Sequence, residues 1–131
     1  MSSAEVKVID GVSILHLDYS NVAIEDSQAS LDGFATLIRA YPPRGALVVN
    51  DFSQVNFNSE NVALLREYVR GNRPHIRAAA VVGITGLKKA IFRSVVILTG
   101  RSDLFLCDTI DEACRRLVGI ARGRVPAPST D

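Results

Sequence analysis

Residues 6–17 read Val6-Lys7-Val8-Ile9-Asp10-Gly11-Val12-Ser13-Ile14-Leu15-His16-Leu17, and this stretch decides how the fold begins. Two runs rich in β-branched and aliphatic residues flank a two-residue link, Asp10-Gly11. Such a link between apolar runs is a strong hairpin signal, because both turn positions need a positive φ. The sequence therefore predicts that the chain opens with an antiparallel pair of strands.

Downstream of this hairpin, apolar residues recur in four segments at the spacing of one buried helix face. They are Leu31, Phe34, Ala35 and Ile38 in the first segment; Val62, Leu65 and Val69, with Leu64 and Tyr68 beside them, in the second; Leu87, Ile91, Val95 and Leu98 in the third; and Ile110, Ala113, Cys114, Leu117, Val118 and Ala121 in the fourth. Short, wholly apolar runs lie between these segments, as expected of strands that are covered on both sides. Pro42 stops the first helix, and Gly71 is placed to end the second. The expected helices are 27–41, 59–70, 87–99 and 110–121, the last capped by Thr109 with Glu112, and the expected strands are 46–49, 78–82 and 104–107.

This alternation predicts a single α/β domain over residues 1–122, with a mostly parallel five-stranded sheet, an antiparallel edge strand and four helices. Residues 123–131 are expected to form a flexible tail. The composition, 47% hydrophobic and 22% charged with a net charge of +1, excludes a disordered or collagen-like chain. Residues 1–62 carry a net charge of −5 and residues 63–131 one of +6. This segregation reflects either solvated helix faces or two surfaces that select partners.

The sequence favours a cytoplasmic protein that does not enter a membrane. Its N-terminus lacks the basic flank and apolar run of a secretion signal, and no stretch approaches the ~20 apolar residues that span a bilayer. Cys107 and Cys114 are seven residues apart, and His16 and His75 are isolated. Structural zinc sites use closely spaced ligand pairs, so we expect buried structural thiols, no metal and no cofactor.

Motifs of catalysis and of nucleic-acid binding are missing from the sequence. It contains no G-x-S-x-G elbow and no Walker motif, so we expect a protein that is not an enzyme. A glycine-bearing turn over residues 83–89 is either a simple turn or an anion site built from free backbone amides. Nucleic acid is not an expected partner, because few aromatic residues are interleaved with the basic ones: Arg66, Arg70, Arg73, Arg77, Lys88, Lys89 and Arg93.

A motif follows the expected strand 46–49. It reads Asp51-Phe52-Ser53-Gln54-Val55-Asn56-Phe57-Asn58-Ser59 and leads into a helix. Together with residues 81–89 and 107–113, it resembles the STAS domain of anti-sigma-factor antagonists and sulfate transporters, in its divergent SpoIIAA-like branch. Asp51, Ser53, Val55 and Phe57 match the family pattern. Asn58-Ser59 stands where Asp-Ser is usual, and one residue of the pattern is missing. The resemblance covers about residues 5–120.

The resemblance implies a non-catalytic module that binds a protein partner, such as an anti-sigma factor or a kinase-like regulator. In several members of that family, a serine at the start of the second helix is a phosphorylation switch, which makes Ser59 the candidate here. Asp51, Asn58, Thr85 and Gly86 are the candidate contacts beside it. Serine is also a favoured helix cap, so Ser59 is either a cap alone or a cap that is also a switch.

Two further interpretations stay open at this stage. A small ligand or an anion could occupy the crevice at the strand ends, near Asp51, Thr85 and Cys107. In the third expected helix, Phe92 and Val96 lie away from the main apolar stripe. They either make a homodimer or partner contact or extend a broad core stripe.

Overall fold

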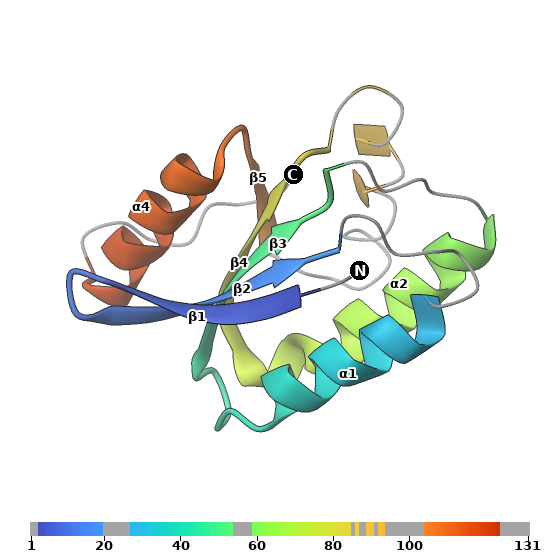
Figure 1. The fold of residues 1–131 in the computed structure, drawn as a ribbon, viewed down its shortest axis with the longest axis horizontal. Helices are drawn as coiled ribbons and strands as arrows, with labels where there is room; N and C mark the ends of the chain where they lie inside the picture. The colour runs from blue at the N-terminus through green and yellow to red at the C-terminus, as the bar shows by residue number, and fades with distance from the viewer. Residues whose placement is uncertain are drawn as a thin grey trace.

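The computed structural model describes residues 3–19, 27–53, 59–84, 86, 89, 90, 92, 93 and 104–123. Five strands form one sheet in chain order, β1-β2-β3-β4-β5 (Figure 1). β1 is antiparallel to β2, and every other neighbouring pair is parallel. The elements are β1 (Ser3–Ile9), β2 (Val12–Asp18), α1 (Ser27–Arg39), β3 (Ala46–Asp51), α2 (Ser59–Asn72), the 3-10 turn η2 (Arg73–His75), β4 (Ile76–Val82), β5 (Leu104–Cys107) and α4 (Ile110–Ala121).

The predicted hairpin is confirmed. Ile9 pairs with Val12, and the two residues between them have positive φ angles, 52° at Asp10 and 80° at Gly11. Both turn positions of a type I′ hairpin require this conformation. The antiparallel edge strand and the inner positions of β3 and β4 are confirmed in the same way.

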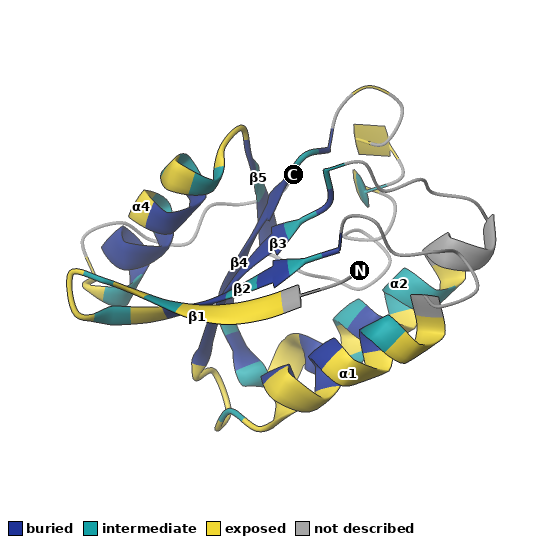
Figure 2. Ribbon diagram, viewed as in Figure 1, coloured by how far each residue is buried: buried dark blue, intermediate teal, exposed yellow. Residues whose placement is uncertain are grey.

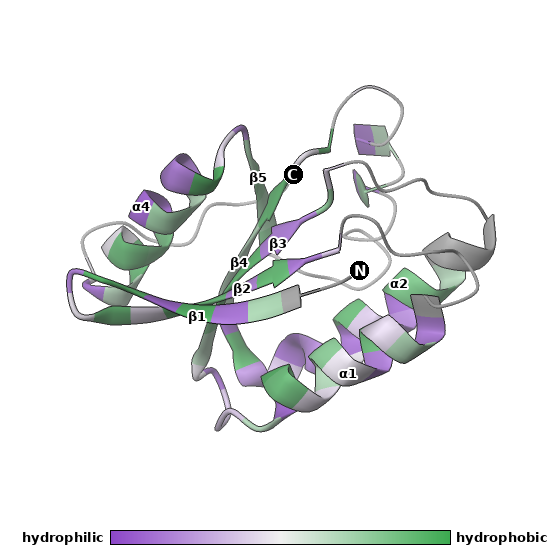
Figure 3. Ribbon diagram, in the orientation of Figure 1, coloured by the Kyte–Doolittle hydropathy of each residue, from purple (hydrophilic) through white to green (hydrophobic). Residues whose placement is uncertain are grey.

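α1 and α2 cover one face of the sheet and α4 covers the other (Figure 1). The strands advance across the sheet in chain order, so right-handed crossovers place α1 and α2 on the same face. Alternate residues of each strand belong to two different apolar clusters, one on each face of the sheet. Val48 belongs to the cluster on the α1–α2 side, and Leu47 and Val49 belong to the cluster on the α4 side. Figures 2 and 3 show the result: the inner strands are buried and largely hydrophobic, whereas β1 and the outer faces of the helices are exposed.

The helix faces agree closely with the sequence for α1 and α4. The four predicted residues of α1 are buried: Leu31, Phe34, Ala35 and Ile38. α1 ends at Arg39 rather than at residue 41, because the residue before a proline disfavours the helical conformation. α4 buries Ala113, Cys114, Leu117 and Val118 of its predicted stripe, whereas Ile110 and Ala121 are partly buried. The Thr109 hydroxyl accepts a 3.1 Å hydrogen bond from the Glu112 amide, which confirms the predicted cap.

The prediction that Gly71 ends the second helix is wrong, because α2 continues through it to Asn72. A Cβ at Gly71 would meet the guanidinium group of Arg39 on α1, so the glycine leaves room for that side chain beside α2. The helix gives way to η2 at the following residues, where Pro74 interrupts the chain.

The apolar stripe of α2 is also centred differently from the prediction. Tyr68, expected at its side, is 8% exposed, whereas Leu65 and Val69 are only partly buried. In the third expected helix, Lys89, Ala90, Phe92 and Arg93 are helical. Its other residues lie outside the described part, as does the expected tail beyond Gly123, so the described residues hold three longer helices, α1, α2 and α4.

Candidate functional site

The carboxyl end of β3 is fixed by its two neighbours. Tyr19 donates its amide to the Asp51 carbonyl at 3.0 Å, and Phe52 donates its amide to the Val82 carbonyl at 2.8 Å. The Asp51 side chain turns back, and its Oδ1 accepts the Ser53 amide at 2.9 Å. The predicted contact residue Asp51 is thus half-buried and holds the start of the loop that follows β3.

The loop that follows β4 packs directly on this turn. Gly83 has a φ of +89°, and a Cβ placed on it would lie 2.5 Å from the Ser53 nitrogen. Only glycine combines this dihedral angle with this close approach. The first residues of the glycine-bearing turn therefore act as a structural contact between two strand ends. Gly86, with a φ of +59°, is exposed.

α2 begins at Ser59, the residue at which the sequence predicts the helix to start. In the chain, α2 follows β3 and the turn that Asp51 and Ser53 form at its end. Phe92 is half-buried and packs against the α1–α2 cluster. This contact agrees with the interpretation that Phe92 extends the apolar core. Asn58, Thr85 and Val96 lie outside the described residues.

A chain of buried polar side chains crosses the α1–α2 side of the core, and sequence reasoning missed it. The Tyr19 hydroxyl donates to Asn50 Oδ1 at 2.8 Å and lies 2.5 Å from the Tyr68 hydroxyl. Tyr68 is also hydrogen-bonded to Asn72, whose Oδ1 accepts from Arg39 Nε at 3.1 Å. The chain thus joins β3, the end of β2, α2 and α1.

The hydrogen bond from Tyr19 to Asn50 decides which phenol donates to the other. Because the Tyr19 hydroxyl donates its proton to Asn50, Tyr68 is the donor in the hydrogen bond between the two phenols. Asn50 Nδ2 in turn donates to the Ala80 carbonyl at 3.3 Å. Burial raises the pKa of both phenols well above the ordinary value of 10.0, which keeps them protonated at neutral pH.

A cavity of about 50 Å³ adjoins this polar chain. Its polar wall is formed by Asn50, Tyr68 and Asn72, and the remaining wall is apolar, with Phe52, Ile84 and Phe92 among its residues. This cavity lies on the α1–α2 side of the sheet. Cys107, expected at a strand-end crevice, belongs to the cluster on the α4 side.

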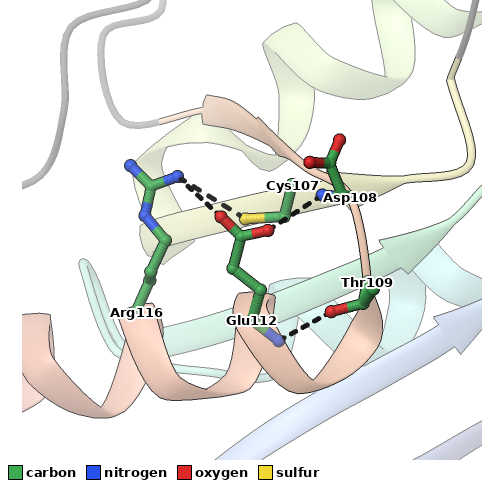
Figure 4. Close-up of polar contacts among 5 residues, drawn as sticks. All are labelled: Cys107, Asp108, Thr109, Glu112 and Arg116. Atoms are coloured by element: carbon green, nitrogen blue, oxygen red, sulfur yellow. Dashed lines mark hydrogen bonds and ion pairs between the residues drawn. The ribbon is translucent and has the colours of Figure 1, made fainter.

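The corner between β5 and α4 explains the environment of Cys107 (Figure 4). Arg116 Nη1 lies 3.8 Å from the Cys107 sulfur and 3.9 Å from Glu112 Oε1, and Glu112 Oε2 accepts the Asp108 amide at 3.1 Å. The Arg116 guanidinium also stacks 4.6 Å from the Phe105 ring centroid. Burial raises the pKa of Cys107, and the same cause raises that of Cys114. Both thiols are free and buried, as predicted.

The basic residues considered above are divided between the two sides of the sheet. Arg70 on α2 pairs with Glu67 at 3.0 Å. Arg77 on β4 donates from Nη2 to the Ile120 carbonyl at 2.8 Å, at the carboxyl end of α4. A cation in that position is favourable for the helix dipole, so Arg77 serves the packing of α4.

The amino-acid sequence matches no known family model, and no curated protein is significantly similar to it. In the part of the chain that the structure describes, every helix is too short or too polar to cross a bilayer. Within that same part, no three histidine, cysteine or acidic side chains gather as metal ligands would.

Proposed function

We propose that this chain is a non-catalytic protein-interaction module of a signalling or partner-switching pathway, switched by phosphorylation of Ser59. The observation that carries the proposal is the start of α2 at Ser59, beyond the turn that Asp51, Ser53 and Gly83 hold in place. The partner is an anti-sigma factor or a kinase-like regulator, as the resemblance to STAS domains implies, and the module acts in the cytoplasm.

The switch follows from the chemistry of a helix start. The first turn of a helix has free backbone amides and the positive end of the helix dipole, so the fold tolerates a phosphate there. The phosphate brings up to about two negative charges to the start of α2. It repels an acidic or closely packed partner without unfolding the module.

The test begins with the tagged chain, its co-purifying proteins identified by mass spectrometry and its phosphosites mapped in the same sample. Ser59→Asp should keep the fold, because an acidic side chain in the first turn of a helix is favourable for the helix dipole, and should weaken binding of the identified partner. Ser59→Ala should fold and bind as the wild type does, or lose modest stability if the Ser59 hydroxyl also caps α2. Ser13→Asp, at an exposed position on β2, is the matched control and should bind as the wild type does. Undiminished binding by Ser59→Asp, with no phosphate at Ser59 in cells, would refute the switch.

The cavity supports a second candidate function, the binding of a very small ligand. At about 50 Å³ it is far below the volume of sites that bind drug-sized molecules, and its mostly apolar lining with a small polar wall fits a small alcohol or amide. Small alcohols and amides should then raise the midpoint of thermal unfolding of the wild type. They should not do so for Asn50→Leu, which removes part of the polar wall.

A further inference from the structure

The outer edge of the sheet presents an apolar strand. β1 is the terminal strand, and Val6 and Val8 are 57% and 67% exposed. Both point to the α1–α2 side, because Val6 pairs with Leu15 of that core cluster. On the other side of the same strand, Glu5 and Lys7 lie 3.7 Å apart. A terminal strand that is apolar on one face is a template for pairing with another strand.

The hairpin turn determines which backbone groups β1 offers. A two-residue turn closes on a hydrogen-bonded pair, here Ile9 with Val12, and hydrogen-bonded pairs then alternate along an antiparallel ladder. The odd-numbered residues of β1 therefore bond to β2. Ala4, Val6 and Val8 direct their amides and carbonyls away from the sheet.

We propose that a second copy of this chain pairs with β1 in antiparallel orientation, about a two-fold axis at Val6. The three outward-directed residues are symmetric about that axis. Val6 then faces the partner's Val6, and Val8 faces the partner's Ala4, through six backbone hydrogen bonds. The two sheets continue as one sheet of ten strands. This proposal does not rest on the function proposed for Ser59.

Charge selects this register over its neighbours. With the axis at Val6, Glu5 lies opposite the partner's Lys7, and Lys7 lies opposite the partner's Glu5. An axis at Glu5 would oppose two carboxylates, and an axis at Lys7 would oppose two ammonium groups. Like charges directly opposite each other destabilise a pair of strands, whereas unlike charges stabilise it. The exposed edge is thus complementary to itself in one register.

Disulfide trapping tests the register directly. In a hydrogen-bonded antiparallel pair the Cα atoms are about 5.5 Å apart, within the range of a disulfide. Val6→Cys should therefore give a covalent dimer under mild oxidation. Val8→Cys alone should not, because the partner's Val8 lies four residues farther along the strand, whereas the double variant Ala4→Cys/Val8→Cys should. Cys107 and Cys114 are buried, so the native thiols should give little background.

Charge exchange tests the same register without a covalent bond. Sedimentation equilibrium over about a hundredfold range of concentration should show a wild-type dimer. Glu5→Lys or Lys7→Glu alone should raise its dissociation constant at least about tenfold, because each creates two like-charged pairs. The combined exchange Glu5→Lys/Lys7→Glu should restore the dimer.

Val6→Pro separates dimer loss from unfolding. It removes only an outward-directed amide, so β1 should keep its bonds to β2 and the circular dichroism spectrum should not change, while the dimer is lost. A wild type that stays monomeric throughout would overturn the proposal. Equal trapping of Val6→Cys and Val8→Cys, or no recovery in the combined charge exchange, would overturn the register and with it the proposed interface.

Discussion

At the scale of single residues, two glycines have roles that differ from those their sequence context suggests. Gly71 follows an apolar stripe and looks like a helix terminator, yet it lies inside α2, where it makes room for Arg39. Gly83 looks like part of an anion-binding turn, yet a Cβ there would collide with the Ser53 backbone. Both roles depend on a neighbour distant in sequence, so composition and spacing alone could not reveal them.

Gly83→Ala should therefore destabilise the protein more than Gly86→Ala. Both residues have a positive φ, which costs an alanine about 1–2 kcal/mol. At Gly83 the collision with Ser53 adds about 1–3 kcal/mol, the usual range for overpacking. Among the described residues nothing lies within 4 Å of a Cβ at Gly86, so that variant is the matched control. Urea unfolding of both variants measures the difference, and equal losses would contradict the role assigned to Gly83.

At the scale of elements, the sequence predicted best what is determined locally. The Asp10-Gly11 turn, the four buried residues of α1 and the cap of α4 all depend on residues within about one or two turns of chain, and all are confirmed. The prediction of the end of α2 was wrong, because the sequence gives no sign of the Arg39 side chain that lies beside Gly71. The sequence placed Tyr68 beside the apolar stripe of α2, and its burial depends on packing against the residue that follows β2.

The cap of α4 gives a prediction at this scale. Thr109→Ala should cost about 1 kcal/mol, because the Glu112 amide loses its acceptor. Thr36→Ala is the matched control. Its hydroxyl bonds to the Asp32 carbonyl within α1, where alanine has the higher helix propensity, so this variant should be neutral or slightly stabilising. Thermal unfolding of the two variants provides the comparison, and a loss of similar size in both would argue against the cap.

At the scale of the whole molecule, the polar chain from Arg39 to Asn50 connects α1, α2, the end of β2 and β3. The sequence contained one signal of it, Asn50, which directly follows the apolar run of β3. Its partners could not be predicted, because Tyr19 and Tyr68 are far apart in the sequence and meet only in the fold.

The candidate site was likewise predictable only in part. The start of α2 at Ser59 was predicted, whereas the cavity was not.

This polar chain makes the stability of the fold sensitive to alkaline pH. Tyr19 and Tyr68 keep their protons in the folded state to a higher pH than in the unfolded chain. Above about pH 10 the unfolded chain releases these protons first, so the free energy of unfolding should fall as the pH rises further. Each phenol contributes a slope of up to about 1.4 kcal/mol per pH unit.

Tyr68→Phe isolates the contribution of one phenol. It should cost about 1–2 kcal/mol at neutral pH, because the polar chain is interrupted, and should reduce the alkaline slope. Urea unfolding of the wild type and of Tyr68→Phe from pH 8 to 11 measures both quantities. If Tyr68→Phe kept the wild-type slope, Tyr68 would not be a group responsible for it.

The order of the strands also bears on how the protein folds. Every strand pairs with the next one along the chain, and partners such as Leu15 and Val48, or Asp51 and Val82, are only about 30 residues apart. The entropy lost on closing each loop is therefore modest, and the contact order of the sheet is low for a parallel arrangement. The sheet can grow in one direction during synthesis, from the hairpin toward β5, with each new strand adding to a template that already exists on the ribosome.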